Sequence, residues 1–350
     1  MAVIMKAVVV EKKGVISVCD DAPMPVIGPY DALVRIETCG FCNGTDTRII
    51  NEEMSAEQGL QPYPTILGHE AAGIVVQVGD KARNIAVGEK HIGIRGAEVA
   101  GSRYSSTHGQ MAEYGYICDW AAKAADGYPM PPKARLKPAR LPDDFDLEDA
   151  GVLLPLCECM TAVRHFGISP QTDVLIYGAG PMGLALMQYM RIEGAKSITC
   201  IDSVPSRLEA AKRIANVDRI INFATEDVDS ALKGQLFDRA VDAVGLSSVI
   251  NEASGRLKPF GVVCSLGVLR KDDNAVNLSA LKNNTLVHML NFPYREYDVL
   301  DENISYIKRG LINPKYYYSH VLPMEQVGEA LRLVNSKEAV KVVLRCNNGT

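Results

Sequence analysis

The residues best suited to chemistry lie in two short segments near the start of the chain. Cys42-Asn-Gly-Thr-Asp46 carries a thiol, and Gly68-His-Glu70 carries an imidazole beside a carboxylate. A thiolate, an imidazole and a carboxylate form the ligand set of a catalytic zinc site, in which three protein ligands leave one position for water or substrate. Cys42, His69 and Glu70 are therefore candidate metal ligands.

A metal ion held by these groups would polarise an alcohol oxygen and lower its pKa, so that an alkoxide forms near neutral pH. The hydroxyl of Thr45, close to Cys42 in the sequence, could pass the alcohol proton towards solvent. Neither segment is specific alone, because a lone Cys is usually buried and a lone His usually makes a structural hydrogen bond. Their significance depends on a second site.

The second site is a glycine turn between an apolar strand and a helix, Asp173-Val-Leu-Ile-Tyr177 followed by Gly178-Ala-Gly-Pro-Met-Gly183. Gly178 permits a tight turn, Gly180 lets backbone approach a pyrophosphate, and Gly183 lets helix and strand pack closely. Pro181 and Met182 lie in the first helical turn, whose free N–H groups face the anion. Asp202, which ends the next strand, would accept hydrogen bonds from the adenosine ribose and favour NAD over NADP.

Two kinds of element must position these groups. Short β-branched runs broken by Gly, Pro and Asn fill the first 120 residues and predict a compact, barrel-like β domain. From about residue 146, strands alternate with helices, which predicts a doubly wound parallel sheet. The expected strands are residues 173–177, 197–202, 219–222, 239–244, 261–266 and 285–290, and the expected helices are 184–192, 206–214 and 249–257.

Ligands bind beyond the carboxyl ends of parallel strands. We therefore expect Val244 and Leu266, at two such ends, to line the cofactor site as well. After Asn291, an amphipathic run at 299–308 and a last strand at 339–344 are expected to return to the β domain. The expected domains are thus 1–154 with 292–350 for the β domain, and 155–291 for the NAD domain.

Composition limits the classes of partner. The chain has 350 residues, 47% apolar and 23% charged, which suits a globular protein of two domains. A net charge of −5 without a Lys/Arg block argues against nucleic acid or an anionic membrane as partner. Nine scattered cysteines suit reduced thiols, and the apolar N-terminus reads as a strand and not as a signal peptide, so we expect a cytoplasmic protein.

The combined pattern resembles the zinc-dependent medium-chain dehydrogenases, closest to the sorbitol, threonine and polyol dehydrogenase branch. The resemblance implies an α/β chain with a split chaperonin-10-like (GroES-like) β catalytic domain around an inserted Rossmann domain, and one catalytic zinc. It also implies a basic residue, Arg207, on the adenosine ribose, and a homodimer or homotetramer joined at the sheet edge of residues 285–290. The matching segments are Cys42–Asp46, Gly68–Gly73, Gly88–Lys90, Gly109–Tyr114, Val174–Gly183, Ile201–Ala211, Val241–Gly245, Pro259–Gly261 and Lys341–Leu344.

The chain departs from the family pattern in several places. Asn43 and Gly44 add one residue between Cys42 and the Thr-Asp pair, so the loop must bulge. Arg48 replaces a histidine that serves a proton relay in many relatives. The segment 93–108 lacks the four cysteines that hold a structural zinc in many relatives, so we expect no structural zinc.

The third protein ligand stays open. Leu154 stands where related sugar dehydrogenases often carry a glutamate ligand, and leucine cannot coordinate zinc. Glu70 could complete the site directly. Alternatively Glu158 could do so, because residues four apart share a helix face and Glu158 would lie one turn from position 154. If Glu158 does not bind zinc, a substrate hydroxyl or amine is its expected partner in an apolar cleft, unless it is simply exposed.

The favoured interpretation is a zinc-dependent, NAD-linked dehydrogenase for a secondary hydroxyl of a polyol, cyclitol or sugar-like substrate. The polar side chains Asn43, Arg48, Glu70 and Glu158 exceed what a simple aliphatic alcohol would need. Two alternatives remain: a zinc-free alkene or quinone reductase of the same superfamily, and a catalytically silent dinucleotide-binding protein.

Overall fold

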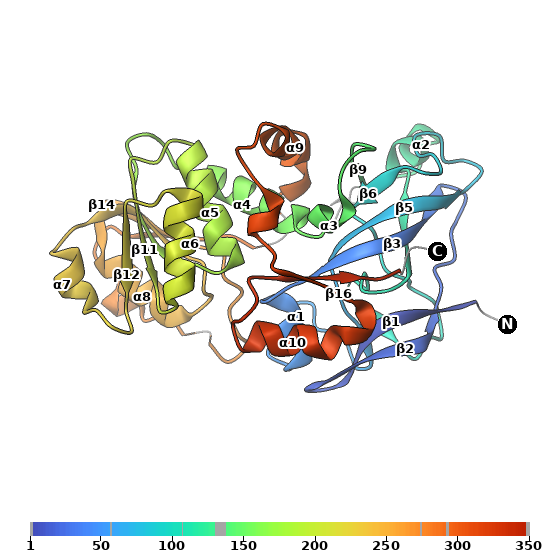
Figure 1. Cartoon of the computed structure of the whole chain (residues 1–350), viewed down its shortest axis with the longest axis horizontal. Helices are drawn as coiled ribbons and strands as arrows, with labels where there is room; N and C mark the ends of the chain where they lie inside the picture. The colour runs from blue at the N-terminus through green and yellow to red at the C-terminus, as the bar shows by residue number, and fades with distance from the viewer. Residues whose placement is uncertain are drawn as a thin grey trace. The chain divides into compact units, whose positions relative to one another are not determined.

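The computed structural model describes residues 3–56, 58–106, 108–129, 138–273, 275–291 and 294–347. The chain divides into two compact units, Met1–Leu154 with Tyr318–Thr350, and Pro155–Tyr317. In Figure 1 the first unit combines the blue N-terminal strands with the red β16 and α10, so both ends of the chain build it.

The first unit consists mainly of antiparallel β-structure. One sheet has the order β2-β1-β4-β7, and a larger one has the order β16-β17-β3-β5-β6-β9, with β8 paired to β3. The strands are β1 (Ile4–Lys12), β2 (Val15–Pro23), β3 (Asp31–Phe41), β4 (Thr65–Ile66), β5 (Glu70–Val78), β6 (Lys90–Ile92), β7 (Ser105–Ser106), β8 (Tyr114–Cys118), β9 (Ala139–Arg140), β16 (His320–Pro323) and β17 (Val342–Arg345). The helices are α1 (Thr45–Ile50), α2 (Trp120–Ala125), α3 (Leu147–Ala150) and α10 (Val327–Asn335).

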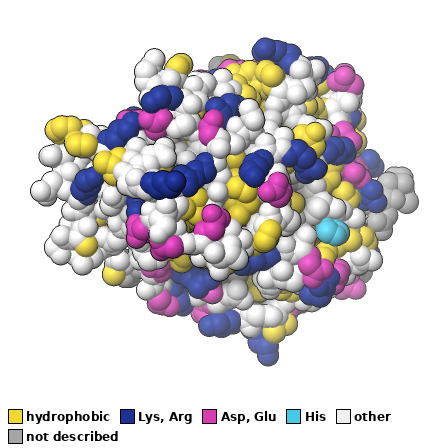
Figure 2. All heavy atoms as spheres, turned by 60° about the vertical axis from the view of Figure 1, so that its left-hand side comes forward, with side chains coloured by type: hydrophobic (Ala, Val, Ile, Leu, Met, Phe, Trp, Pro, Cys, Tyr) yellow, Lys and Arg dark blue, Asp and Glu magenta, His cyan; other side chains and the backbone are white. Residues whose placement is uncertain are grey.

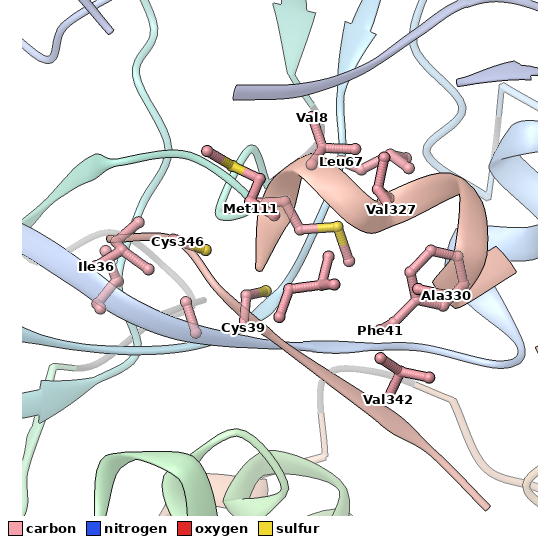
Figure 3. Packing of buried hydrophobic residues seen from close by; sticks show 14 of the residues in the cluster. Val8, Ile36, Cys39, Phe41, Leu67, Met111, Val327, Ala330, Val342 and Cys346 are labelled. Atoms are coloured by element: carbon pink, nitrogen blue, oxygen red, sulfur yellow. The ribbon is translucent and has the colours of Figure 1, made fainter. Parts of the chain in front are cut away.

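The core of this unit joins the two ends of the chain. Figure 3 shows Phe41 and Cys39 of β3 packed with Val327 and Ala330 of α10 and with Val342 of β17. All five side chains are almost fully buried. Because β17 pairs antiparallel with β3 in this core, the segment just before β17 is held beside the end of β3. The core therefore fixes a C-terminal segment against the predicted metal ligands.

The second unit is built on one six-stranded sheet in the order β12-β11-β10-β13-β14-β15. Every neighbouring pair in it is parallel, and the order reverses at β10, as in doubly wound dinucleotide-binding folds. Its strands are β10 (Asp173–Tyr177), β11 (Ser197–Asp202), β12 (Arg219–Asn222), β13 (Phe237–Asp242), β14 (Leu257–Ser265) and β15 (Leu286–Met289). Its helices are α4 (Leu153–His165, which begins at the end of the first unit), α5 (Pro181–Ile192), α6 (Pro205–Ala215), α7 (Val228–Leu232), α8 (Ser247–Gly255) and α9 (Leu300–Lys308).

Local sequence explains the elements nearest the glycine turn. All five residues of β10 are buried, which is why this strand reads as a continuous apolar run. Helix α5 begins with Pro181, whose fixed φ suits a first helical position and whose missing N–H costs nothing there. Helices α5 and α6 lie against each other beside β10 to β12 (Figure 1).

The second domain boundary differs from the sequence expectation. The expected return to the β domain at residue 292 is wrong, because the parallel-sheet unit continues to Tyr317. Helix α9 packs on this unit through the fully buried Asn303, whose Oδ1 accepts a 2.7 Å hydrogen bond from the Tyr189 hydroxyl. Its Nδ2 lies 3.4 Å from the Cys157 sulfur on α4. These polar contacts place α9 on the parallel-sheet unit. The amphipathic sequence of the helix does not by itself specify which domain it covers.

Candidate active site

Strand pairing brings the predicted metal ligands together in the first unit. Cys42 follows the end of β3, and His69 directly precedes β5. The two strands pair antiparallel with Gly40 opposite Glu70, so the end of one meets the start of the other. The Cys42 sulfur, a His69 ring nitrogen and a Glu70 carboxylate oxygen consequently lie within 4.8 Å of one another. Among the described residues, Cys42, His69 and Glu70 are the one group of three or more possible ligands close enough to hold a metal ion.

Asp46 lies against two of these ligands, His69 and Cys42. Its carboxylate is fully buried, with Oδ1 3.4 Å from His69 Nδ1 and Oδ2 accepting a 2.8 Å hydrogen bond from the Cys42 amide. Burial lowers the pKa of His69, but the nearby Asp46 carboxylate and Cys42 thiol outweigh burial and raise it well above its ordinary value. In many metal sites, a carboxylate next to the ring nitrogen that does not bind the metal fixes the orientation of the histidine ring. Nε2 of His69 is thereby left for the metal side, 3.8 Å from Glu70 Oε1.

Glu70 is held by a buried lysine. Lys341 Nζ lies 2.8 Å from Oε1 and 2.7 Å from Oε2 of Glu70, and both residues are at most 4% exposed. Burial lowers the pKa of Lys341, but the negative charge of Glu70 raises it more, so the ammonium form is retained. Gly40 makes room for this pair, because a Cβ there would lie 2.3 Å from Glu70 Oε2. The lysine neutralises a carboxylate that would otherwise be costly to bury.

The Cys42 loop ends in helix α1. The Thr45 amide donates a 3.3 Å hydrogen bond to the Cys42 sulfur. Thr45 itself is half-buried at the first position of α1, and the proton-transfer role of its hydroxyl stays a prediction. Arg48 lies on the same helix, half-buried.

Glu158 is carried by the other unit. It lies half-buried on α4 between the fully buried Cys157 and Cys159, while Leu154 is 6% exposed one turn earlier. The two cysteines are fully buried, but each sulfur also has a polar neighbour: Asn303 Nδ2 lies 3.4 Å from Cys157, and the Met182 carbonyl lies 3.5 Å from Cys159. Glu158 stays the alternative third ligand or a substrate contact.

The glycine turn has the geometry that its sequence predicts. Gly178 has φ +99°, in the left-handed region that favours glycine. At Gly183 a Cβ would lie only 2.0 Å from the Gly178 carbonyl oxygen, so only glycine allows this approach of helix and turn. Gly180 is the N-cap of α5, and a Cβ there would have one heavy atom at 4.0 Å, Nη1 of Arg207. Pro181 and Met182 begin the helix. The space next to its N-cap, Gly180, is open except for the guanidinium of Arg207.

Asp202 is tied to the same turn. Its Oδ2 accepts a 2.7 Å hydrogen bond from the Ala179 amide, and its Oδ1 accepts from the amides of Ser203 and Val204 at 2.7 and 2.8 Å. The carboxylate is 7% exposed at the end of β11. It therefore shapes the glycine turn, and Oδ2, which accepts a single amide, keeps a further acceptor site for a ribose hydroxyl.

The two remaining predicted cofactor contacts lie just beyond strand ends. Leu266 directly follows β14, and its amide donates a 3.1 Å hydrogen bond to the Asp242 carbonyl. Val244 lies beyond the end of β13, which stops at Asp242 and not at 244 as expected, and it is 44% exposed. The fully buried Asp242 accepts hydrogen bonds from the Val244 and Gly245 amides at 2.9 Å and from the Ser265 hydroxyl.

Sequence reasoning gave no role to Asp46, Lys341 or Asp242. Lys341 had a usable signal, since a single lysine flanked by Ala339, Val340 and two valines must find a buried carboxylate partner. Asp46 had a weaker one, its place beside the candidate ligand Cys42. The partners themselves could not be read, because they are distant in sequence.

The surface carries mixed charge. On the face shown in Figure 2, Lys and Arg side chains are interspersed with Asp and Glu. Within the described residues, all nine cysteines are free, and no helix combines the length and apolar character needed to cross a membrane.

Comparison with known families gives two matches. A family model described as "Alcohol dehydrogenase GroES-like domain" matches residues 28–124. A second, described as "Zinc-binding dehydrogenase", matches residues 181–303. The first lies within the β unit that carries Cys42, His69 and Glu70, and the second lies within the parallel-sheet unit.

Individual proteins agree with these matches. An alcohol dehydrogenase of Cupriavidus necator is 30% identical over 317 residues, covering 83% of this chain and 84% of that protein. A sorbitol dehydrogenase of Bombyx mori is 25% identical over 349 residues, covering 93% and 94%. Among solved structures, an alcohol dehydrogenase from Escherichia coli CFT073 complexed with NADH has a TM-score of 0.77 at 20% identity, covering 98% and 99% of the two chains, which shows the shared fold.

Proposed function

The chain belongs to the zinc-dependent medium-chain dehydrogenases, and we propose that it transfers a hydride between NAD and a secondary alcohol of a polyol, cyclitol or sugar-like molecule, or the matching ketone. The proposal depends above all on Cys42, His69 and Glu70, whose ligand atoms lie within 4.8 Å of one another. Their chemistry separates this chain from an alkene or quinone reductase, which has no use for a thiolate, imidazole and carboxylate on one ion.

These three residues fit zinc. Tetrahedral zinc bonds of about 2.0 to 2.3 Å place ligand atoms roughly 3.3 to 3.8 Å apart, so side chains that already lie within 4.8 Å of one another need to close in by about 1 Å at most. Bound there, zinc would supply Lewis-acid polarisation of the alcohol oxygen and lower its pKa. Three protein ligands leave a fourth position for substrate. We propose one catalytic zinc per chain, and no structural zinc.

The chain's own residues prepare this centre. Asp46 holds the His69 ring through Nδ1 and leaves Nε2 to bind the metal. Lys341 compensates the charge of Glu70, which limits the cost of burying that carboxylate. The Thr45 amide holds the Cys42 sulfur by a hydrogen bond, and we propose that the Thr45 hydroxyl carries the alcohol proton towards solvent.

NAD is the proposed cofactor. The glycine turn at 178–183 offers helix amides for a pyrophosphate, with the Arg207 guanidinium beside it. The Asp202 carboxylate at the end of β11 would accept from ribose hydroxyls and repel a 2′-phosphate.

Asp202→Ala tests this assignment. We expect kcat/KM for NAD to fall by about tenfold or more, because a charge-assisted hydrogen bond and the shape of the turn are lost. The preference for NAD over NADP should relax. Arg213→Ala on the exposed part of α6 is the control. An unchanged NAD/NADP ratio in the Asp202 variant would contradict the assignment.

A hydroxyl-rich substrate is the proposed class. The polar side chains Asn43, Arg48, Glu70 and Glu158 exceed what a plain alcohol needs, and the B. mori relative is named a sorbitol dehydrogenase. The test is NAD reduction with matched polyols, cyclitols, amino alcohols and plain secondary alcohols. We expect the highest kcat/KM among polyols or cyclitols, and preference for plain alcohols would overturn the substrate class.

A homodimer or homotetramer is the proposed assembly. Strand β15 ends the sheet, and its side chains Leu286, Val287 and Met289 are 57%, 41% and 48% exposed. An apolar edge strand pairs readily with a second copy. Light scattering should give at least a dimer, and Val287→Lys should shift it towards monomer; a monomeric wild-type protein would refute this assembly.

A further inference from the structure

Asn43 makes a long-range contact from the loop that carries Cys42. Its Nδ2 donates a 2.9 Å hydrogen bond to the Val340 carbonyl, almost 300 positions away in the sequence. Its Oδ1 is buried and has no hydrogen-bond partner among the described residues. Only the Nδ2 end of the side-chain amide thus makes a hydrogen bond. This bond joins the Cys42 loop to the segment before β17.

The segment at Val340 and Lys341 is fixed on its other side. The Ser319 hydroxyl accepts a 3.0 Å hydrogen bond from the Val340 amide, and the Ser319 amide donates to the Lys341 carbonyl at 3.0 Å. Lys341 in turn holds both oxygens of Glu70. One chain of contacts therefore runs from Ser319 through Lys341 to Glu70, and Asn43 attaches Cys42 to it.

The other hydrogen bonds of the Cys42 loop are local and run to residues of α1. Residues 42–44 form a turn before α1. Within it, the Cys42 amide is held by Asp46, and Gly44 is the N-cap without a side-chain cap. Among the described residues, Asn43 ties this turn by a side-chain hydrogen bond to a distant segment, while the Cys42 side chain lies beside His69 and Glu70. Its amide sets the separation between the loop that carries the thiolate and the segment that positions the Glu70 carboxylate.

We infer that Asn43 is a positioning residue of the metal centre, whose amide fixes the Cys42 thiolate relative to the Lys341–Glu70 pair. The inference rests on the proposed zinc site and deepens it. Partners that orient metal ligands typically contribute about 10- to 100-fold to metal affinity. Loss of the Asn43 amide should therefore loosen the bound ion without unfolding the unit.

The test is Asn43→Leu, which keeps the side-chain volume and removes both polar atoms. Removal of the unpartnered Oδ1 offsets part of the cost of leaving the Val340 carbonyl without its donor, so thermal stability should fall only slightly. The matched control is Asn347→Leu in the same unit, where Nδ2 donates to the Ile36 and Glu113 carbonyls at 2.7 and 2.9 Å, away from the metal centre. Asn43→Ser, too short to reach Val340, serves if the leucine variant does not fold.

Two readouts are measured on the zinc-loaded and the cobalt-substituted full chain. We expect zinc transfer to a chromophoric chelator to be at least about tenfold faster in the Asn43 variant than in the control. We also expect the thiolate-to-cobalt charge-transfer band to shift in the Asn43 variant only. Zinc release and a band equal to those of Asn347→Leu would overturn the inference while leaving the proposed function intact. A wild-type chain that binds no zinc would instead overturn the proposed function.

Discussion

The metal group and the glycine turn are assembled in opposite ways. The metal group, meaning the ligands Cys42, His69 and Glu70 with the lysine that pairs with Glu70, takes its side chains from distant segments. The pairing of β17, β3 and β5 brings these segments together. The glycine turn is one continuous segment from β10 to α5, and its function lies in backbone amides and missing side chains. The first is therefore sensitive to changes in charge and ligand type, and the second to added volume.

This difference predicts that each site can be disabled while the other survives, because the two lie in separate compact units. The first and largest effect is expected for Cys42→Ser. Loss of the thiolate should remove zinc and, with it, several kcal/mol of transition-state stabilisation, so turnover should fall by about 1000-fold. Metal analysis, alcohol oxidation and NADH titration check this.

Cys19→Ser is the matched control, since Cys19 is a free, half-buried thiol of the same unit. It should keep zinc and turnover. NADH binding should be unchanged in both variants, and a Cys42→Ser protein that keeps its zinc would contradict the ligand assignment.

Lys341→Met tests the charge balance of the metal group. Without the ammonium, the buried Glu70 keeps only the more distant His69 ring, 3.8 Å away, as a cationic neighbour, and the free energy of unfolding of the zinc-free protein should fall by about 3 kcal/mol. Added zinc should restore part of this loss, because the ion takes over as the cation beside Glu70. Chemical denaturation with and without zinc measures both effects. Equal stability of variant and wild type without zinc would show that the pair contributes nothing.

Gly183→Ala tests the glycine turn. The new Cβ would lie 2.0 Å from the Gly178 carbonyl oxygen, so turn and helix must separate at a cost of about 1 to 3 kcal/mol. We expect NADH affinity to fall by about 10-fold or more while zinc content is kept. Gly255→Ala at the end of α8 is the control, because a Cβ there meets no heavy atom within 4 Å. Unchanged NADH affinity in Gly183→Ala would refute the close-approach argument.

The smallest effect is expected for Glu158→Gln, which separates the two candidate third ligands. If Glu70 completes the zinc site, zinc content should be unchanged and KM for the polyol should rise by about tenfold, from a lost charge-assisted hydrogen bond. Glu70→Gln, its counterpart in the other unit, should instead lower zinc affinity. The reverse pattern would make Glu158 the metal ligand.

The contrast between the sites also decides what sequence could predict. The bounds of β10, β11 and β12 and the roles of Gly178 and Gly183 followed from sequence, because they depend on local patterns of apolar residues and glycines. Cys42, His69 and Glu70 were identified by residue type, but their grouping depends on strand pairing, which is why Glu158 remained an equal alternative.

Long-range packing explains what was missed. The roles of Lys341 and Asn43 depend on contacts with Glu70 and Val340, far along the chain. Helix α10 was not expected at all, and its burial on the core of the first unit reflects the return of the chain end. The expected helix at 249–257 ends earlier, at Gly255, because Leu257 already belongs to the fully buried start of β14.

The most direct test is to measure zinc per chain, by mass spectrometry of the dialysed wild-type protein, together with NAD-linked oxidation of its best polyol before and after chelation. The account predicts about one zinc per chain, loss of turnover when that ion is removed, and recovery when zinc is returned. A zinc-free protein that oxidises the polyol at the full rate would contradict it.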